Sequence, residues 1–260
     1  VQCLAANEIS DIVGILNGTT NFILTKMVKE GMPFDEALAM AQRLGYAEKD
    51  PSADIDGVDA CRKIAILTSL AFGKHVDPDL VYTEGIAGIT LTDVAYAEKW
   101  GGVIKLIGRV RRFDDDRVMP TVYPAFIPGY SQLSTVDDVF NAIMVRGDAI
   151  GDVMFYGRGA GKLPTASAVV ADVVDCVKHI KARKYLFWEE SEPGYIRDHA
   201  TAFGEMFVRA ATSDYEGALA FLSDAFKIVR VLSEPGDEVA VILTGVEGEI
   251  KSALLHSDRL

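Results

Sequence analysis

A polar, irregular stretch from Lys181 to Ala200 is the feature that most limits how this chain can fold. It reads KARKYLFWEESEPGYIRDHA and carries a proline and a glycine side by side. Domain boundaries usually fall in polar segments of this kind. We therefore interpret residues 183–202 as a linker, and the length of 260 residues is sufficient for a folded unit on each side of it.

Before the linker, patterns typical of helices and of strands occur in separate groups. Residues 8–16 are apolar and β-branched, as expected for a strand, and the turn NGTTN leads into a helix that Gly31 ends. Further helices are predicted at residues 33–45, 58–73 and 165–180, and strands of one sheet at residues 103–113, 118–127 and 152–161. The stretch between the helices at 33–45 and 58–73 is predicted to be a long loop. This grouping favours an α+β fold.

The segment after the linker has a pattern of its own. It predicts a strand at 205–212, a helix at 214–226, strands at 227–233 and 238–244, and the start of a helix at 246–255. This order resembles a small ferredoxin-like α+β unit that lacks its last strand.

Charge, cysteine content and hydropathy exclude several classes of protein. The formal net charge of −12 argues against a general nucleic-acid partner. The cysteines, Cys3, Cys61 and Cys176, are far apart and show neither metal-ligand spacing nor a disulfide framework, which suits the cytoplasm. No run reaches the ~18 apolar residues of a membrane span. The chain opens at Val1 in mid-pattern, so we expect further sequence upstream.

The segment GYAEKDPSADIDGVDACRK, from Gly45 to Lys63, gathers carboxylates around a terminal lysine. A calcium-binding loop is one interpretation, because DIDG places Asp54, Asp56 and Gly57 at its third, fifth and sixth positions. Lys63 then occupies the twelfth position, where a bidentate glutamate is needed. A cation at the place of the strongest anionic ligand argues against calcium, and we predict no metal site.

Lys63 itself is the informative residue of this segment. On a helix, Asp59 and Lys63 share a face, and Ile66, Leu67 and Leu70 continue the stripe, so we interpret Lys63 as the start of a face that enters the core. A structural ion pair is one explanation of this pattern. The other is a functional lysine that donates a proton to a carbonyl oxygen or polarises it.

A functional lysine in this setting also indicates a kind of substrate. The surplus carboxylates could bind a cationic group such as an α-ammonium, and Tyr46 and Glu48 precede the loop closely enough to reach the same pocket. An amino acid with a reducible carbonyl fits both halves of this arrangement.

Residues 41–63 resemble the signature of homoserine dehydrogenases. The matching residues are Gly45, Tyr46, Ala47, Asp50, Pro51, Asp54, Ile55, Gly57, Asp59 and Lys63. Two flanking segments, GILNGTTNFIL at 14–24 and GRGAGKLPTASAVVADVVD at 157–175, resemble the same family, so the resemblance covers roughly residues 5 to 182.

The resemblance implies an activity, a cofactor and a set of site residues. The family interconverts L-homoserine and L-aspartate 4-semialdehyde with NAD or NADP, and Lys63 matches the acid/base, with Asp59 beside it. Homoserine-binding positions of the family match Glu48, Asp54, Asp59, Tyr46 and Thr19. Glycines at which the backbone approaches the cofactor match Gly45 and Gly161. Ala53 stands where some relatives carry a further aspartate.

The glycine run GRGAG has a structural reading as well. It precedes a helix, so its amides could face a cofactor, but it is not the dinucleotide fingerprint, because Lys162 occupies the place of the last glycine. A tight turn between a strand and a helix explains the run equally well.

The resemblance also implies how the domains are arranged. Residues 1–16 would end a Rossmann-like nucleotide-binding domain, most of which precedes Val1. Residues 17–158 would form a catalytic domain whose mixed sheet carries helices on one face and binds both substrate and a second copy. Residues 159–182 would return as a helix to the nucleotide-binding domain. The expected oligomer is a homodimer or homotetramer.

Residues 203–260 resemble an incomplete ACT domain, the amino-acid-sensing unit of many bacterial relatives. An effector such as L-threonine is the expectation, although Glu216 replaces the usual proline before the glycine, and a packing role is the alternative. A non-catalytic module for amino-acid binding and dimerisation is the alternative for the whole chain.

Overall fold

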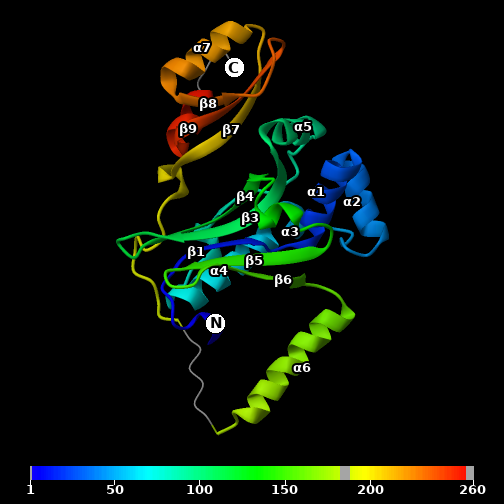
Figure 1. Cartoon of the computed structure of the whole chain (residues 1–260), viewed down its shortest axis with the longest axis vertical. Coiled ribbons are helices and arrows are strands. Elements are labelled where there is room, and N and C mark those ends of the chain that lie inside the picture. Colours follow the sequence, from blue (N-terminus) through cyan, green and yellow to red (C-terminus); the bar gives the residue numbers. More distant parts are fainter. Residues whose placement is uncertain (1, 182–187, 256–260) are drawn as a thin grey trace. The chain divides into compact units, whose positions relative to one another are not determined.

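The chain forms two compact units in its computed structural model, which describes residues 2–181 and 188–255 (Figure 1). The first unit comprises Val1–Val94 and Gly102–Ile196, and the second comprises Ala95–Gly101 and Arg197–Leu260. Within the described residues, no helix is long and apolar enough to cross a membrane.

A six-stranded sheet organises the first unit, in the order β2-β4-β3-β1-β5-β6. The strands are β1 (Ile9–Ile15), β2 (Tyr82–Thr83), β3 (Gly102–Arg112), β4 (Val118–Pro128), β5 (Phe140–Gly147) and β6 (Gly151–Arg158). The sheet is mixed, as predicted, because β2 runs parallel to β4 while the other neighbours are antiparallel. β1 lies between β3 and β5, so the domain boundary expected at residue 16 falls inside one unit.

The α-helices of the first unit precede, connect and follow these strands. They are α1 (Gly18–Glu30), α2 (Phe34–Arg43), α3 (Ser52–Ile55), α4 (Val58–Phe72), α5 (Leu91–Trp100), whose second half belongs to the second unit, and α6 (Lys162–Lys178). The predicted long loop therefore contains the short helix α3, and Gly57 joins α3 to α4 at φ 82°, a left-handed conformation that favours glycine.

The two faces of the sheet are packed differently. On one face, Gly14 and Gly108 leave room for Leu16, since an added Cβ would lie 2.7 and 2.6 Å from its side chain, and Ile64 of α4 packs next to Gly108. On the other face, Leu133 and Val136 at the 3₁₀ helix Gln132–Thr135 close an apolar cluster with strand residues such as Ile107. Strand alternation explains why neighbouring residues of β1 serve opposite faces.

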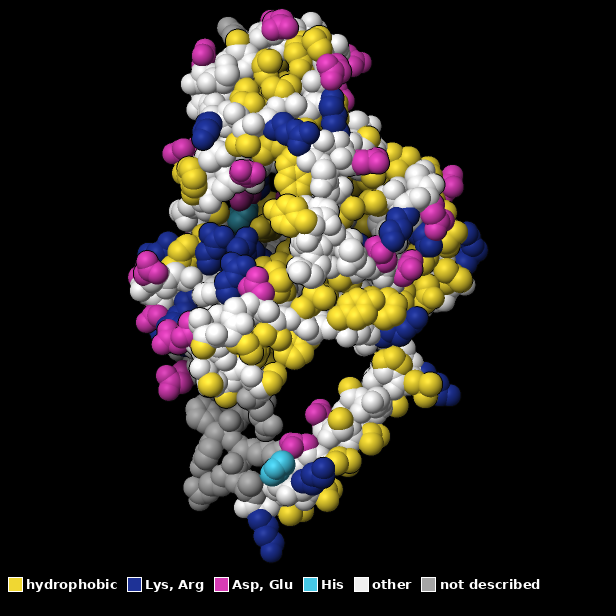
Figure 2. Space-filling model, viewed as in Figure 1, with side chains coloured by type: hydrophobic (Ala, Val, Ile, Leu, Met, Phe, Trp, Pro, Cys, Tyr) yellow, Lys and Arg dark blue, Asp and Glu magenta, His cyan; other side chains and the backbone are white. Residues whose placement is uncertain are grey.

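Helix α6 carries apolar side chains that stay at the surface. None of its residues is buried, and hydrophobic side chains run along its length (Figure 2). The exposed apolar residues are Leu163, Val169, Val170, Val173, Val174 and Val177. The helix that the sequence predicts therefore forms, but its apolar surface has no counterpart in the described part of the chain.

Part of the predicted linker is attached to the first unit. Glu189 forms a parallel bridge with Lys74, and its backbone exchanges hydrogen bonds with Gly73 and His75. The Lys74 ammonium lies 2.6 Å from Glu192 and 5.0 Å from the ring centroid of the buried Tyr195. Residues 188–196 thus form a strap against the end of α4, whereas residues 183–187 of the predicted linker lie outside the described residues.

The second unit has the predicted order of strands and helices. It contains β7 (Phe203–Ala211), α7 (Tyr215–Ala225), β8 (Lys227–Val231), β9 (Glu238–Val246) and α8 (Glu247–Leu255). Its antiparallel sheet has the order β7-β9-β8, and α7 and α8 contribute Leu222 and Ile250 to an apolar core over β9.

Candidate active site

The site is organised by the junction between β1 and α1. Asn17 is the N-cap of α1, and its Oδ1 accepts a hydrogen bond from the backbone N–H of Thr20 at 2.9 Å. Its Nδ2 donates to Asp54 Oδ1 at 2.6 Å and to Asp59 Oδ2 at 2.8 Å. One buried amide thereby joins two carboxylates that come from α3 and α4.

Lys63 is bound to the same junction from the other side. Its ammonium donates to Asp59 Oδ2 at 2.7 Å, one helical turn earlier, and to the backbone carbonyl of Leu16 at 3.0 Å. An ammonium has three N–H donors, so one of them has no partner among the described residues. This leaves Lys63 able to donate to a bound oxygen.

The sequence-based expectation that Lys63 leads a face into the core is wrong. The Lys63 side chain is 48% exposed, and Ile66 is 50% exposed. The buried residues of α4 are Ala60, Cys61, Ile64, Ala65, Thr68 and Ser69. The stripe that contains Lys63 therefore faces away from the sheet, and the lysine is accessible to a substrate rather than enclosed.

Thr19 and Tyr46, two predicted substrate-binding residues, contact each other. Thr19 Oγ1 donates to the backbone carbonyl of Tyr46 at 2.7 Å, which ties the first turn of α1 to the loop after α2. The Tyr46 ring meets Phe22 edge-on, with centroids 5.1 Å apart. Tyr46 remains 42% exposed, so part of its ring is free to contact a ligand.

Three predicted site residues lie outside the hydrogen-bond network of Asn17: Glu48, Gly45 and Gly161. The exposed Glu48 carboxylate has no hydrogen bond or ion pair within the described residues, although its backbone carbonyl accepts from Gln42. Gly45 has φ 75°, and among the described residues beyond its chain neighbours no atom lies within 4 Å of the place that a Cβ would take. Gly161 has φ 121° at the N-cap of α6. Their predicted roles stay predictions.

The arrangement presents acceptors and one donor on the same surface. Asp54 Oδ2 and Asp59 Oδ1 accept no hydrogen bond from a described residue, so both remain available to a cationic group. Lys63 offers a proton donor next to them. In the described part of the chain, no three His, Cys, Asp or Glu side chains are grouped so that they could hold a metal ion.

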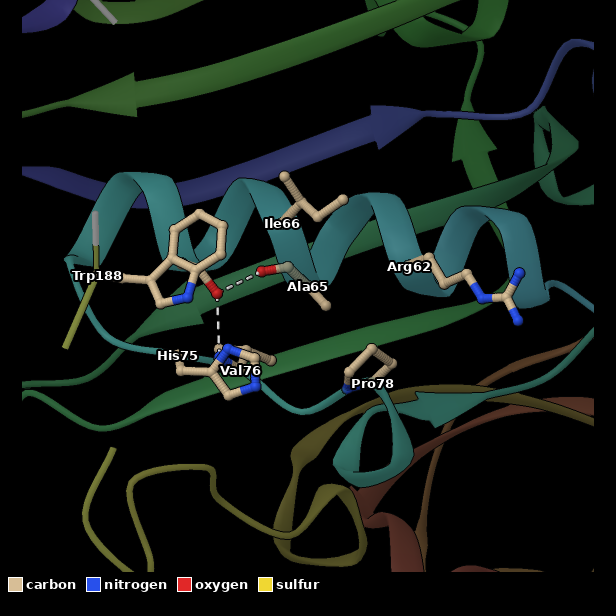
Figure 3. A pocket seen from close by; sticks show the side chains of 8 residues that line it. Arg62, Ala65, Ile66, His75, Val76, Pro78 and Trp188 are labelled. Carbon is tan, nitrogen blue, oxygen red and sulfur yellow. Dashed lines mark hydrogen bonds between the residues drawn. The ribbon is translucent and has the colours of Figure 1, made fainter. Parts of the chain in front are cut away.

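A pocket beside α4 is lined by other residues, which on this helix run from Arg62 to Ser69. It has a volume of about 310 Å³ and lies between α4 and Trp188 of the strap (Figure 3). Ser69 stabilises its floor, because Ser69 Oγ donates to the carbonyl of Ala65 and accepts from the N–H of Val76. None of the predicted site residues lines it, so we assign the candidate site to the β1–α1 junction.

Two members of the site are absent from the sequence-based prediction. The pattern places Asn17 only in a turn, and the carbonyl of Leu16 carries no sequence signal. Asn is a preferred N-cap, so the pattern NGTT before an apolar helix identifies its capping role. Its contacts with Asp54 and Asp59, which lie 37 and 42 residues away, have no local signal.

Comparison with known proteins gives the family. The family model for homoserine dehydrogenase matches residues 1–174. Homoserine dehydrogenase from Synechocystis sp. is 52% identical over 180 residues, which cover 68% of this chain and 41% of that protein. Homoserine dehydrogenase from Corynebacterium glutamicum is 45% identical, and the match covers 100% of this chain and 60% of that protein.

A solved structure shows the same fold. The crystal structure of a homoserine dehydrogenase from Thiobacillus denitrificans has a TM-score of 0.89 and 37% identity, covering 99% of this chain and 63% of that one. The chain thus spans roughly two fifths to three fifths of the length of these relatives. With a family model over most of its residues and close relatives along its length, this chain belongs to the homoserine dehydrogenase family.

Proposed function

We propose that this chain forms the substrate-binding part of an enzyme that interconverts L-homoserine and L-aspartate 4-semialdehyde. The observation that carries the proposal is the group of Asp54, Asp59 and Lys63 around Asn17. Two acceptor oxygens and one ammonium donor suit a substrate that has an ammonium group at one end and a hydroxyl or carbonyl oxygen at the other.

The proposed chemistry assigns a role to each side chain. Asp54 and Asp59 bind the α-ammonium group, with Glu48 as a further carboxylate from the preceding loop. Lys63 donates a proton to the C4 oxygen when the aldehyde is reduced and accepts it when the alcohol is oxidised. Asp59 and the Leu16 carbonyl hold the Lys63 ammonium in place during this transfer. Thr19 and Tyr46 border the same surface.

The residues present fit the edge of a nicotinamide cofactor, which would supply or accept the hydride at C4. Gly161 is the N-cap of α6, a helix of 17 residues, and no described side chain caps that end, so the backbone N–H groups of Lys162 and Leu163 are available to an anion, whereas Pro164 has none. At Gly45, no atom of a described residue beyond its chain neighbours lies within 4 Å of the position of a Cβ, so the backbone is open to close approach. Both NAD and NADP remain in the proposal.

An assay with paired substrates tests the function. We expect the natural protein that carries this chain to oxidise L-homoserine with NADP or NAD, and to show no measurable rate with 4-hydroxybutanoate. The second compound keeps the alcohol but lacks the α-ammonium group that Asp54 and Asp59 would bind. Production of NADPH or NADH, followed by absorbance, is the measurement.

The outcomes of this assay separate the competing functions. Equal rates with both compounds would show that the carboxylates do not bind an ammonium group. L-homoserine binding by calorimetry without turnover in the natural protein would favour a non-catalytic amino-acid-binding module.

The second unit is proposed to be an ACT-like regulatory domain. Its βαββα order supports this assignment, and Asp214 caps α7 at the loop where an effector such as L-threonine would bind. Glu216 follows this cap in place of the usual proline. Inhibition of turnover by L-threonine, measured against L-valine as a control, tests the effector role.

A homodimer is proposed to form through the sheet of the first unit. β6 is an edge strand, and it exposes Met154, Phe155 and Tyr156 by 38%, 45% and 54%. Exposed apolar residues on a sheet edge are typical of an interface. Sedimentation velocity with the variant Phe155→Glu tests this, and we expect a shift towards the monomer.

A further inference from the structure

We propose that Asn17 is a positioning residue that sets the separation of Asp54 and Asp59 and, through Asp59, the place of the Lys63 ammonium. The inference rests on the proposed function and extends it. It assigns specificity for the substrate ammonium to a neutral amide that itself does not touch the substrate. The three contacts described above carry it: two donations from one Nδ2 atom and the capping acceptance at Oδ1.

The orientation of the Asn17 amide is determined by its surroundings. Oδ1 faces the backbone N–H of Thr20, which can only donate, at 2.9 Å. Nδ2 faces Asp54 and Asp59, whose ionised carboxylates can only accept. A flipped amide would set donor against donor on one side and acceptor against acceptors on the other. The cap therefore orients the group that joins the carboxylates.

The amide has no remaining donor for another partner. Its two N–H groups each serve one carboxylate, and its oxygen serves α1. Asn17 is 5% exposed, so its contacts compete little with water. A buried amide with every polar group satisfied resists rotation, because any movement leaves a buried donor or acceptor without a partner.

Electrostatics gives the amide its importance. Asp54 and Asp59 are like charges from two helices, and like charges held close together repel. Lys63 pairs with Asp59, at the Oδ2 atom that also accepts from Asn17, and forms no ion pair with Asp54 among the described residues. The amide supplies a donor to both carboxylates without adding charge. The pair therefore keeps its free oxygens for a substrate ammonium instead of recruiting a solvent cation.

Two substitutions separate this role from helix capping. In Asn17→Ser, the serine is still a good N-cap, but its side chain is too short to contact both carboxylates. Asn17→Ala removes both the cap and the contacts with the carboxylates. We expect Asn17→Ser to melt closer to the wild type than Asn17→Ala does, because it loses the carboxylate contacts but keeps the cap. We expect its kcat/KM for L-homoserine to fall about 10- to 100-fold, as is usual for misplaced site groups. Asn17→Ala should lose a similar factor and also melt earlier.

Asn17→Asp gives a pH signature that a structural role does not produce. Aspartate caps α1 as well as asparagine does, but it sets a third carboxylate against Asp54 and Asp59, with Lys63 as the facing cation. Lowering the pH puts a proton on one of the three carboxyl groups, which then donates in place of the amide. We expect the ratio of variant to wild-type kcat/KM to rise as pH falls.

Substrate binding measured without cofactor gives an independent readout. By calorimetry, L-homoserine should bind Asn17→Ser about tenfold more weakly than wild type, the loss expected for about 1.4 kcal/mol. If the wild-type protein oxidises L-homoserine, and Asn17→Ser binds and oxidises it with the wild-type affinity and kcat/KM, the inference is overturned and the proposed function is retained. A wild-type protein that neither binds nor oxidises L-homoserine would instead remove the proposed function. A pH-independent ratio for Asn17→Asp would reduce Asn17 to a helix cap.

Discussion

Two lysines of the first unit, Lys63 and Lys105, occupy opposite kinds of environment. Lys63 is on α4, its side chain is 48% exposed, and it uses Asp59 and the Leu16 carbonyl as partners. Lys105 is on β3, is 3% exposed, and donates to Asn21 Oδ1 at 3.0 Å and to the Val136 carbonyl at 2.7 Å. Asp137 lies 3.5 Å from its ammonium.

The difference shows which kind of lysine can serve a substrate. The three contacts of Lys105 account for its three donors, so it connects α1 to the segment after the 3₁₀ helix and has nothing left to offer. Lys63 keeps one donor and is open to solvent. Burial of a charged group thus identifies a structural connection here, whereas partial exposure beside carboxylates identifies the candidate site.

The largest effect is expected from removing the ammonium of Lys63. Lys63→Met should lower kcat/KM for L-homoserine by about 10²- to 10⁴-fold, the usual contribution of a general acid or base. Its unfolding free energy should change by less than about 1 kcal/mol, because the Asp59 pair is half-exposed. Urea denaturation alongside the rate assay checks both numbers. Near-normal turnover would remove Lys63 from the mechanism.

Removal of the buried ammonium of Lys105 should lower stability and leave substrate binding unchanged. Lys105→Met leaves Asn21 Oδ1 without its buried donor, which costs about 1–3 kcal/mol. The Val136 carbonyl loses one of its two donors and keeps the hydrogen bond from Asn21 Nδ2. We expect lower stability in urea, while the remaining folded protein binds L-homoserine with wild-type affinity. A loss of binding at full stability would contradict the contrast between the two lysines.

The same buried lysine predicts a pH effect. Burial lowers the pKa of Lys105 below its ordinary value of 10.5, against the opposing effect of Asp137. The unfolded chain therefore binds this proton more tightly, and wild-type stability rises with pH between the lowered pKa and 10.5. Lys105→Met lacks this contribution. We expect denaturation at several alkaline pH values to show the unfolding free energy of the wild type rising with pH relative to that of Lys105→Met. A difference between the two free energies that does not change with pH would contradict a lowered pKa of Lys105.

The smallest effect is expected at Ile66, next to Lys63 on the exposed stripe of α4. Ile66 is 50% exposed, so Ile66→Ser should change the unfolding free energy of this chain by no more than about 0.5 kcal/mol. Ile64→Ala, on the buried side of the same helix, is the matched control and should cost about 2–5 kcal/mol. Similar losses for the two would mean that the stripe is buried.

Local patterns predicted the helices α1, α2, α4 and α6 and the elements of the second unit well. The helix α1 runs between a polar turn and Gly31, α2 follows Pro33, and both have apolar residues at helical spacing, so few alternatives exist. The helix α6 also follows its pattern, but the pattern does not say what covers its valines. The spacing of apolar residues predicts which face of a helix is apolar, but it does not predict which element covers that face.

Long-range pairing accounts for most of what was missed. β5 was not predicted, and the place of β1 between β3 and β5 depends on partners roughly a hundred or more residues away in sequence. The short β2 and α5 were also missed. At the site, the spacing of Asp59 and Lys63 predicted their contact, because one helical turn is local. The wrong assignment of Lys63 to the core arose because Ile66 and Leu70 share its stripe and no partner for that stripe could be deduced.

The Asn17 contacts have a consequence for how the protein folds. The Asp59–Lys63 pair spans 4 residues and can form as soon as α4 does, whereas the amide contacts close loops of 37 and 42 residues. Contacts of such high contact order form only when β1, α3 and α4 have come together. A partly folded intermediate can therefore hold the ion pair yet have no affinity for substrate. Recovery of L-homoserine binding during refolding would report the closing of the tertiary structure rather than the growth of its helices.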